Sequence, residues 1–328
     1  MTRALVIGGT RFIGRHTVRE FLARDDDVTI FTRGNRPNPF ADEERVDHVT
    51  GDRRERDALE SARAAVDPEI VVDCVAYFPR DVREATEVFT DAEAYVYVSS
   101  GAAYGKERVP KREDDTPLAG CTPEQATTDS RATYGPRKAE GDREVFGAAA
   151  DGVRAMSVRP TVVYGPHDYT ERFAYWVDRV DSFDRVLVPS DGLSLWQMAY
   201  VEDVASALRI VAERGEAGEA YNVGDEHAPT LGGWIDLLED ACETSVERVG
   251  ASANELATVG LDPDDFPIYR SPPHLLSTGK LRDLGWTATP HDAALAATVE
   301  EHLASGRTGR EHGPDRNVTE RLLDRRDT

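Results

Sequence analysis

The chain has 328 residues, of which 40% are hydrophobic, so it can build a large core and is neither a disordered nor a fibrous sequence. Its 61 acidic and 39 basic residues give a formal charge of −22 at pH 7. Because such a charge repels phosphate backbones and anionic lipid surfaces, the composition disfavours a general nucleic-acid binder or a membrane-surface protein. It is compatible with a local basic pocket for one small anion.

The basic residues are almost all arginine, since only four of the 39 are lysine. A surface rich in carboxylates and poor in lysine suits a cytoplasm full of salt, where the Debye length falls to about 3 Å at 1 M and charge repulsion is screened. We interpret the chain as a halophilic, cytoplasmic protein with a haloarchaeal type of composition; an ordinary acidic protein from a high-GC genome is the alternative. The three cysteines lie far apart, and the sequence predicts neither a signal peptide nor a membrane span.

Short apolar runs alternate with helical patterns in the first half of the chain, which predicts βαβ units and a parallel sheet. The expected strands cover residues 4–7, 28–31, 46–50, 70–75, 95–99 and 155–163, and the clearest helices cover 12–23, 204–213 and 231–241. We therefore predict an α/β fold with a doubly wound parallel sheet over residues 1–163. Residues 164–306 are expected to form a smaller C-terminal substrate lobe, with a strand returning to the main sheet near 220–224. The charged residues 307–328 are expected to form a frayed tail or a surface helix.

A glycine-rich turn joins the first strand to the first helix. It runs through Gly8, Gly9, Thr10, Arg11, Phe12, Ile13 and Gly14. Backbone amides at such a helix start point at an anion, and glycines allow a tight turn and the close approach of a pyrophosphate. Because strand, turn, helix and position all agree, we predict a Rossmann domain that binds a dinucleotide here; a simple turn is the alternative.

Charged residues near this turn bear on which nicotinamide cofactor binds. An acidic residue after the second strand suits the ribose hydroxyls of NAD, whereas an arginine suits the 2′-phosphate of NADP. This chain has Arg33 after that strand and Arg11 inside the turn, which favours NADP over NAD; solvated loop arginines are the alternative. Asp52, after the third strand, is expected to accept from the adenine amino group, unless it is an ordinary turn aspartate.

A tyrosine and a lysine four residues apart, Tyr134 and Lys138, share one face of a predicted helix. An ammonium beside a phenol stabilises the phenolate, so this tyrosine can exchange a proton with a substrate hydroxyl while hydride moves to or from the nicotinamide. Pro136 fits the first turn of a helix, which is expected to put Tyr134 at the helix start. Ser99 and Ser100, at the end of the fifth strand, are candidates for a hydroxyl that bonds the substrate oxygen.

With these motifs the chain resembles the extended short-chain dehydrogenase/reductases, the family of NAD(P)-dependent epimerases and dehydratases, over about residues 3–303. The glycine turn resembles the GxxGxxG of that family, and the tyrosine–lysine pair resembles its YxxxK. Further landmarks follow in the family's order at residues 159–166, 201–205, 221–224 and 280–286. The resemblance implies the same fold and an NAD(P)-dependent enzyme.

The resemblance also implies site residues. It selects Ser100 over Ser99, because the catalytic hydroxyl of the family lies four residues before the tyrosine of a Tyr-Gly pair. Ser100 would then act with Tyr134 and Lys138, and the lysine would also hold the nicotinamide ribose. Pro160, in the strand-six signature, would contact the cofactor. The stretch after Gly165-Pro166 faces the nicotinamide in the family, which gives three substrate candidates: His167, Arg172 and Tyr175.

The sequence departs from the family pattern at several places. Arg11 replaces the central glycine, and this form of the turn resembles a divergent branch that includes chloroplast stem-loop RNA-binding proteins. Gly101-Ala102 stands where the 4,6-dehydratases of the family carry an Asp-Glu pair. Residues 106–130 lengthen the connection to the YxxxK segment, and residues 196–200 lack the cation that holds a nucleotide-sugar diphosphate in many relatives.

We therefore expect an NAD(P)-dependent epimerase or dehydrogenase/reductase that acts on a sugar-like, and potentially nucleotide-sugar, secondary alcohol. A cofactor-binding, RNA-associated or regulatory protein is the alternative, and the charge of −22 opposes it. No His/Cys/Asp cluster has the spacing of metal ligands, so no metal site is expected. A homodimer through the helices that flank the YxxxK segment is an expectation from the family.

Overall fold

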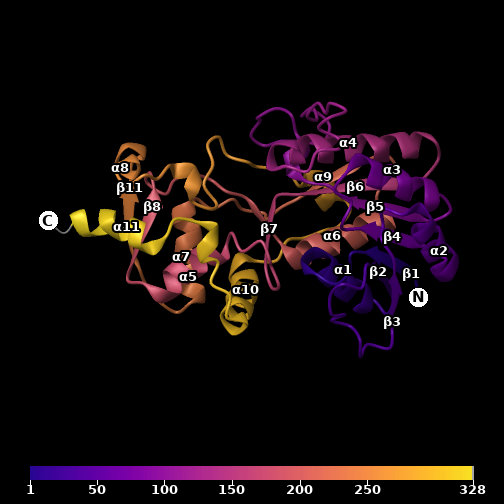
Figure 1. Cartoon of the computed structure of the whole chain (residues 1–328), viewed down its shortest axis with the longest axis horizontal. Coiled ribbons are helices and arrows are strands. Elements are labelled where there is room, and N and C mark those ends of the chain that lie inside the picture. The colour runs from indigo at the N-terminus through magenta and orange to yellow at the C-terminus, as the bar shows by residue number, and fades with distance from the viewer. Residues whose placement is uncertain (327–328) are drawn as a thin grey trace. The chain divides into compact units, whose positions relative to one another are not determined.

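The computed structural model describes residues 1–326, which divide into two compact units (Figure 1). Unit 1 comprises residues 1–161, 201–224 and 276–288, and unit 2 the intervening segments and the C-terminal part of the chain. The last two residues of the predicted tail lie outside the described part. The boundaries at 163 and 306 stay predictions of domain organisation.

Unit 1 is built on a sheet of seven strands in the order β10-β6-β5-β4-β1-β2-β3, and neighbouring strands all run parallel. The strands are β1 (Arg3–Ile7), β2 (Asp27–Thr32), β3 (Val46–Thr50), β4 (Ile70–Asp73), β5 (Ala94–Val98), β6 (Ala155–Pro160) and β10 (Ala220–Val223). Strands β1, β4, β5 and β6 carry almost only buried side chains, as expected for strands covered on both faces. The prediction of an α/β fold with a doubly wound parallel sheet is confirmed.

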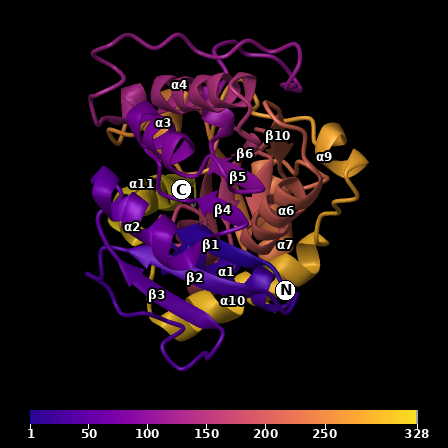
Figure 2. The ribbon, with the colours of Figure 1, turned by 90° about the vertical axis from the view of Figure 1, so that its right-hand side faces the viewer.

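Helices cover both faces of this sheet (Figure 2). One face carries α1 (Phe12–Leu22) and α6 (Val201–Arg214), which pack against each other. The other face carries α2 (Arg56–Val66), α3 (Pro79–Val88) and α4 (Arg131–Ala150), whose apolar side chains form one core cluster with the strands. A short 3-10 turn, η1 (Gly101–Ala103), follows β5, and α9 (Gly279–Asp283) lies beside β10.

The sixth strand is shorter than the sequence predicts. It ends at Pro160, and the Thr161 amide still donates to the Val223 carbonyl of β10. The next three residues form a separate strand, β7 (Val162–Tyr164), which pairs with β9 (Met198–Tyr200) in unit 2. A proline has no amide hydrogen to donate, so it suits the last position of a strand but not a continuous ladder through it. The expectation of one strand over 155–163 is therefore wrong.

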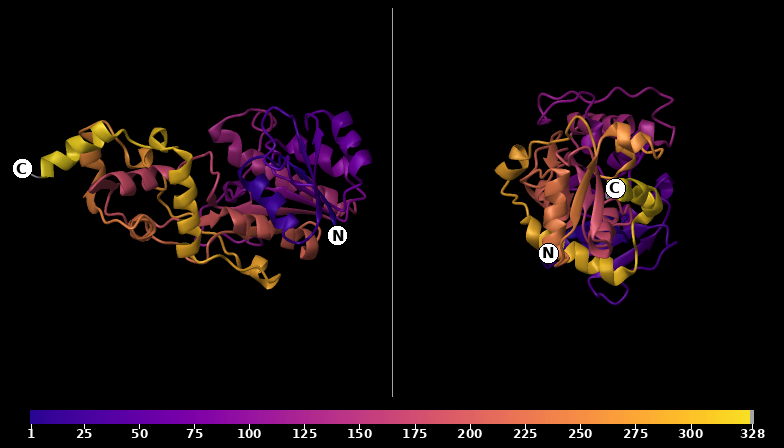
Figure 3. Two further views of the ribbon diagram at one scale, coloured as in Figure 1. Left: turned by 90° about the horizontal axis from the view of Figure 1, so that it is seen from below. Right: turned by 90° about the vertical axis from the view of Figure 1, so that its left-hand side faces the viewer.

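Unit 2 contains two small parallel sheets and several helices. Besides β7 and β9 it has β8 (Arg185–Pro189) paired with β11 (Glu247–Ala251), and its helices are α5 (Ala174–Ser182), α7 (Leu231–Ala241), α8 (Ala253–Ala257), α10 (His291–Ser305) and α11 (Arg316–Leu323). Short 3-10 turns occur at η2 (Pro263–Asp265), η3 (Arg310–His312) and η4 (Asp324–Arg326). The charged C-terminal segment, yellow in Figure 3, contains α11, which buries Leu322 and Leu323 and packs on β8. Within residues 1–326, no helix has both the length and the apolar character required to cross a bilayer.

Candidate active site

The glycine turn lies at the carboxyl end of β1, between the neighbouring strands β2 and β4. This is the point where the order of the strands reverses, and ligands of doubly wound sheets bind there. Gly8 has φ +95°, which only glycine adopts freely. A Cβ on Gly14 would lie 2.3 Å from the Gly8 carbonyl oxygen, so the start of α1 can approach β1 this closely only with glycine there.

The turn fits a dinucleotide. Helix α1 begins at Phe12 with Arg11 as its N-cap, and the Arg11 side chain does not cap the helix. The positive end of the α1 dipole lies at this turn, which is the setting that a pyrophosphate requires. The residues that would hold it are the predicted set: Gly8, Gly9, Thr10, Arg11, Phe12, Ile13 and Gly14.

Three charged residues gather after β2 and β3, where an adenosine would bind. Both carboxylate oxygens of Asp52 accept from Arg54 Nε, at 3.0 and 3.1 Å. The Arg54 guanidinium lowers the pKa of Asp52 to about 2, and the charge of exposed Arg33 acts in the same direction. Sequence reasoning found Arg33 and Asp52 but missed Arg54, which already occupies the oxygens expected to receive the adenine amino group.

The residue between Asp52 and Arg54 belongs to a buried ion pair, which sequence reasoning also missed. Arg53 Nη2 donates to Asp73 Oδ2 at 2.6 Å and to the Asp81 carbonyl oxygen at 2.9 Å. The Tyr95 hydroxyl donates to the same Asp73 oxygen at 3.1 Å. The network joins the ends of β3 and β4 to the first turn of α3, so it fixes the loops that border the cofactor turn. An arginine after Asp52 and an aspartate ending β4 were the signals available in the sequence.

Helix α4 carries the predicted tyrosine and lysine. Ser130 caps the helix, because its Oγ accepts from the Thr133 amide. Tyr134 is therefore the fourth residue of α4, and Pro136 lies in the second turn rather than the first. The expectation that Pro136 marks the first turn is wrong, because the Ser130 cap starts the helix several residues earlier.

Lys138 is buried, with 3% of its surface exposed. Its Nζ donates to the carbonyl oxygens of Ala76, after β4, and Val98, at the end of β5, at 2.9 and 2.8 Å. The ammonium lies 4.7 Å from the centre of the Tyr97 ring and 5.9 Å from the centre of the Tyr134 ring. The structure thus brings Tyr134 and Lys138 together at the carboxyl ends of the central strands.

Burial lowers the pKa of Lys138 to about 8. The carboxylates of Asp73, Asp142 and Asp81 act in the opposite direction and keep the ammonium from losing its proton at lower pH. A desolvated positive charge next to a phenol stabilises the phenolate more strongly than a hydrated charge does. The half-buried Tyr134 therefore lies in the electrostatic setting that a proton-exchanging tyrosine needs.

The two serines after β5 differ in their surroundings. Ser99 is 2% exposed, and its hydroxyl has no hydrogen-bond partner among the described residues. Ser100 is partly exposed, and its Oγ accepts from the Ala102 amide at the start of η1. A Cβ on Gly135 would lie 2.5 Å from the Ala102 carbonyl oxygen, so glycine lets the N-terminal part of α4 lie directly on η1. The Ser100 turn and the Tyr134 turn are neighbours for this reason.

The other predicted contacts are spread over both units. Pro160 is buried at the end of β6 in unit 1. In unit 2, His167 pairs with Glu301, Nδ1 to Oε1 at 3.0 Å, and Arg172 is exposed. Tyr175 is 1% exposed and donates to the Pro314 carbonyl oxygen, so it packs the interior of unit 2 and we do not include it in the proposed site.

One group of metal-ligand type lies in unit 2, where the sequence spacing predicted none. Ligand atoms of Glu171, Glu311 and His312 lie within 4.8 Å of one another. Two of these residues are exposed, and Glu171 Oε1 is also 3.7 Å from Arg307 Nη1. We assign no ion to this group.

The comparison with known proteins agrees with this geometry. The model of the NAD dependent epimerase/dehydratase family matches residues 4–224. The chain belongs to this family. Its members are NAD-dependent enzymes of the extended short-chain dehydrogenase/reductase type, so the family predicted from the glycine turn and the YxxxK pair is confirmed and the cofactor is of the NAD type.

Two curated relatives and one solved structure illustrate the similarity. The chloroplast stem-loop binding protein of 41 kDa b from Arabidopsis thaliana is 28% identical over 73% of this chain, which spans 62% of that relative's length. The low-salt glycan biosynthesis protein Agl12 from Haloferax volcanii is 26% identical over 91% of this chain and 98% of its own. The dTDP-glucose 4,6-dehydratase of Bacillus anthracis in complex with NAD superposes with a TM-score of 0.73 at 19% identity, covering 95% of this chain and 99% of that one. The relatives therefore include a protein named for stem-loop binding beside proteins named as enzymes or for glycan biosynthesis.

Proposed function

We propose that the protein is an epimerase or reductase that moves hydride to or from a secondary alcohol of a sugar, with a nucleotide sugar as the leading substrate class. The observation that carries this proposal is the desolvated ammonium of Lys138 beside the Tyr134 ring, at the carboxyl ends of β4 and β5. The relative that is named for glycan biosynthesis supports a sugar substrate.

The proposed chemistry assigns one task to each residue. Bound in the glycine turn, the nicotinamide cofactor supplies hydride acceptance or donation at the substrate carbon. The Tyr134 phenolate oxygen takes the proton of the substrate hydroxyl, and the Lys138 ammonium stabilises that phenolate near neutral pH. The Ser100 hydroxyl donates to the same substrate oxygen and holds it in line. In an epimerase Tyr134 returns the proton after the sugar has turned. In a reductase the Tyr134 hydroxyl gives a proton once, to the oxygen of the carbonyl group that is reduced.

Dehydration is the family reaction that this site supports least. The two residues after Ser100 are Gly101 and Ala102, whose side chains have no group that can act as an acid or a base. They belong to η1, which Ser100 caps. A 4,6-dehydration needs an acid and a base at this place in addition to the tyrosine. Epimerisation and reduction need neither.

We further propose NADP as the preferred cofactor. Arg33 and Arg54 both lie near Asp52, and the Asp52 charge is already matched by Arg54. This leaves the Arg33 guanidinium for a 2′-phosphate, whereas a carboxylate ready to accept ribose hydroxyls is missing from the cluster. We propose a halophilic, cytoplasmic setting as well, because the lysine-poor composition and the charge of −22 suit high salt. A homodimer is proposed from the family resemblance alone.

An RNA-associated protein is the second candidate, because the chloroplast relative is named for stem-loop binding. The net charge of −22 opposes it. A gel shift with structured RNA, repeated from low to molar KCl, distinguishes the two, since an RNA-binding protein retains a complex in at least the low-salt lanes.

The test of the enzyme proposal uses protein purified in molar KCl. Denaturation releases any bound nicotinamide nucleotide, which is identified as NAD or NADP; empty protein is titrated with NADPH and NADH. Turnover is then followed on a panel of nucleotide sugars. Tyr134→Phe is expected to lower kcat by about 10²–10⁴-fold and to leave cofactor affinity nearly unchanged. Tyr221→Phe is the matched control. It removes a hydroxyl that accepts from the Glu216 amide and that lies outside the candidate catalytic set. Turnover that survives Tyr134→Phe contradicts the mechanism.

A further inference from the structure

A chain of buried polar groups runs through unit 1 behind the candidate site. Arg159 in β6 is 2% exposed, and its Nε donates to Asp142 Oδ2 of α4 at 2.8 Å. Its Nη1 donates to the Tyr104 hydroxyl at 3.1 Å. That hydroxyl in turn donates to Asn222 Oδ1 of β10 at 2.8 Å. Three elements of the unit, α4, β6 and β10, and the segment after η1 meet in this chain of bonds.

The two side chains that Arg159 holds belong to the two segments that carry the candidate catalytic groups. Asp142 lies one helical turn after Lys138 on α4. Tyr104 directly follows η1, which Ser100 caps. The guanidinium therefore links the helix of Tyr134 and Lys138 to the turn of Ser100.

Two further contacts act on the same junction. The close approach of Gly135 to the Ala102 carbonyl sets the spacing of the backbones, as described above. Lys138 Nζ bonds the Val98 carbonyl, two residues before Ser100. Three separate contacts thus hold the Ser100 turn: the backbone packing at Gly135, the Lys138 bond and the Arg159 bond to Tyr104.

Stability alone gives a poor reason for this arrangement. A buried ion pair is often no more stabilising than apolar side chains of the same volume, because both charges lose their hydration. Unlike apolar side chains, a planar guanidinium fixes the positions of its hydrogen-bond partners relative to one another. Both partners of Arg159 lie close in sequence to the candidate catalytic groups. Catalysis by oriented groups depends on such fixed geometry, since a shift of about 1 Å can cost a factor of about 10² in rate.

We propose that Arg159 is a positioning residue, which acts through Tyr104 and Asp142 to hold Ser100 at the working distance from Tyr134. The proposal rests on the proposed function, because it assumes that these two groups share one substrate oxygen. Under this proposal the Tyr104 hydroxyl affects catalysis through its bond to Arg159 and not through a contact with the substrate.

Tyr104→Phe tests the proposal with a small change, since it removes one hydroxyl and keeps the buried ring. We expect kcat to fall by about 10- to 100-fold, with KM for the cofactor within about twofold of wild type. The pH profile of kcat should keep its shape in Tyr104→Phe, because Tyr134, Lys138 and the charges around them are still present. Asp142→Asn should lower kcat as well, but it also removes a carboxylate that raises the pKa of Lys138, so its pH profile should shift to lower pH. The proposal is overturned if Tyr104→Phe lowers kcat no more than the control variant Arg209→Met does.

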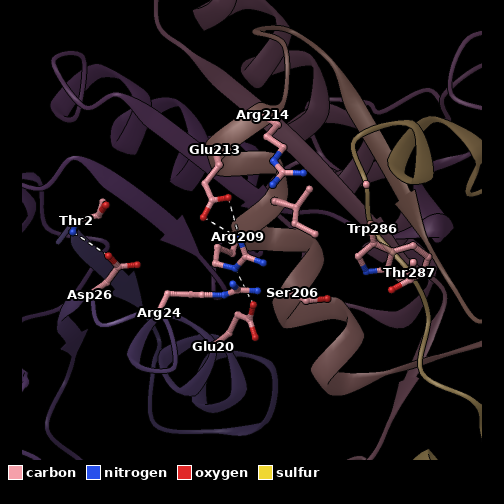
Figure 4. A pocket seen from close by; sticks show the side chains of 12 residues that line it. Thr2, Glu20, Arg24, Asp26, Ser206, Arg209, Glu213, Arg214, Trp286 and Thr287 are labelled. Carbon is pink, nitrogen blue, oxygen red and sulfur yellow. Dashed lines mark hydrogen bonds and ion pairs between the residues drawn. The ribbon is translucent and has the colours of Figure 1, made fainter.

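Arg209→Met is the matched control (Figure 4). Arg209 is also a buried arginine of unit 1 that joins two helices, with Nε 2.7 Å from Glu20 of α1 and Nη1 2.8 Å from Glu213 of α6. It touches neither catalytic segment. The control should lower the melting temperature while kcat, measured well below that temperature, stays at the wild-type value.

A second readout does not depend on turnover. In Tyr104→Phe, amide hydrogen exchange should speed up together at residues 99–105 and 131–138, whereas Arg209→Met should speed it up in α1 and α6 only. Unchanged exchange in both catalytic segments overturns the positioning proposal even if kcat falls. If the wild-type protein turns over no sugar at all, the proposed function fails, while coupled exchange of the two segments still supports the structural link.

Discussion

Lys138→Met is expected to change how the stability of the protein depends on pH. Burial lowers the pKa of Lys138 to about 8 in the folded chain, whereas an unfolded lysine titrates near 10.4. Because one pKa unit corresponds to about 1.4 kcal/mol, the folded chain carries a penalty of about 3 kcal/mol for keeping this ammonium at pH 7.

The sign follows from proton counts. Between about pH 8 and pH 10.4 the folded chain has released the Lys138 proton and the unfolded chain has kept it. The unfolded state then binds more protons, so the free energy of unfolding rises with pH. The penalty is complete below about pH 8 and has vanished above about pH 10.4.

The assay is urea unfolding followed by tryptophan fluorescence at constant KCl, from about pH 7 to pH 10.5. The unfolding free energy of wild type minus that of Lys138→Met should rise by about 3 kcal/mol over this range. Taking the difference removes the titration of other groups and the constant cost of leaving the Ala76 and Val98 carbonyls without their donor. Lys106→Met, at an exposed lysine, gives the baseline for removing one positive charge. A difference that stays flat across the range would refute the argument that Lys138 is desolvated.

Two further predictions concern the cofactor turn and the pair beneath it. Gly14→Ala puts a methyl group 2.3 Å from the Gly8 carbonyl oxygen, so calorimetric titration should show cofactor affinity reduced by more than about tenfold; Gly147→Ala in α4, where a Cβ meets nothing within 4 Å, should bind normally and be slightly more stable. Arg53→Met leaves a buried carboxylate without its partner and should cost about 3–5 kcal/mol in urea unfolding, whereas the neighbouring exposed Arg54→Met should change stability little; equal effects of the two substitutions would contradict the burial described here.

Local patterns predicted the parts of the fold that depend on neighbours in sequence. The first five strands begin and end within about two residues of the apolar runs that predicted them, and α7 covers the residues expected, 231–241. The glycine turn was predictable because its function requires a strand, a turn and a helix start in immediate succession. Pro160 was the signal in the sequence for the end of β6, but the sheet that each half of 155–163 joins was not predictable, because it depends on the distant partners β10 and β9.

In the candidate site, too, features set by neighbours in sequence could be predicted and features set by distant partners could not. Tyr134 and Lys138 could be paired from their spacing on one helix. The bonds of Arg53 to Asp73 and of Arg159 to Tyr104 span 20 and 55 residues, and no periodicity connects such positions. Likewise, the bonds of His167 to Glu301 and of Tyr175 to Pro314 span more than 130 residues, so sequence position could propose these two side chains as substrate contacts but could not show what surrounds them.

Unit 1 is made of three segments that are separated in sequence by parts of unit 2, and this has a consequence for its biosynthesis. When residue 161 leaves the ribosome, six strands of the sheet exist, but the edge strand β10 and the covering helix α6 still have to be made. At about 5–20 residues per second the next 60 or so residues take roughly 3–12 s, during which the apolar face that α6 later covers is bare and β6 is an open edge. The protein therefore has a window during synthesis in which its nascent sheet is open to chaperones, and the high density of acidic charge along the chain opposes self-association in that interval.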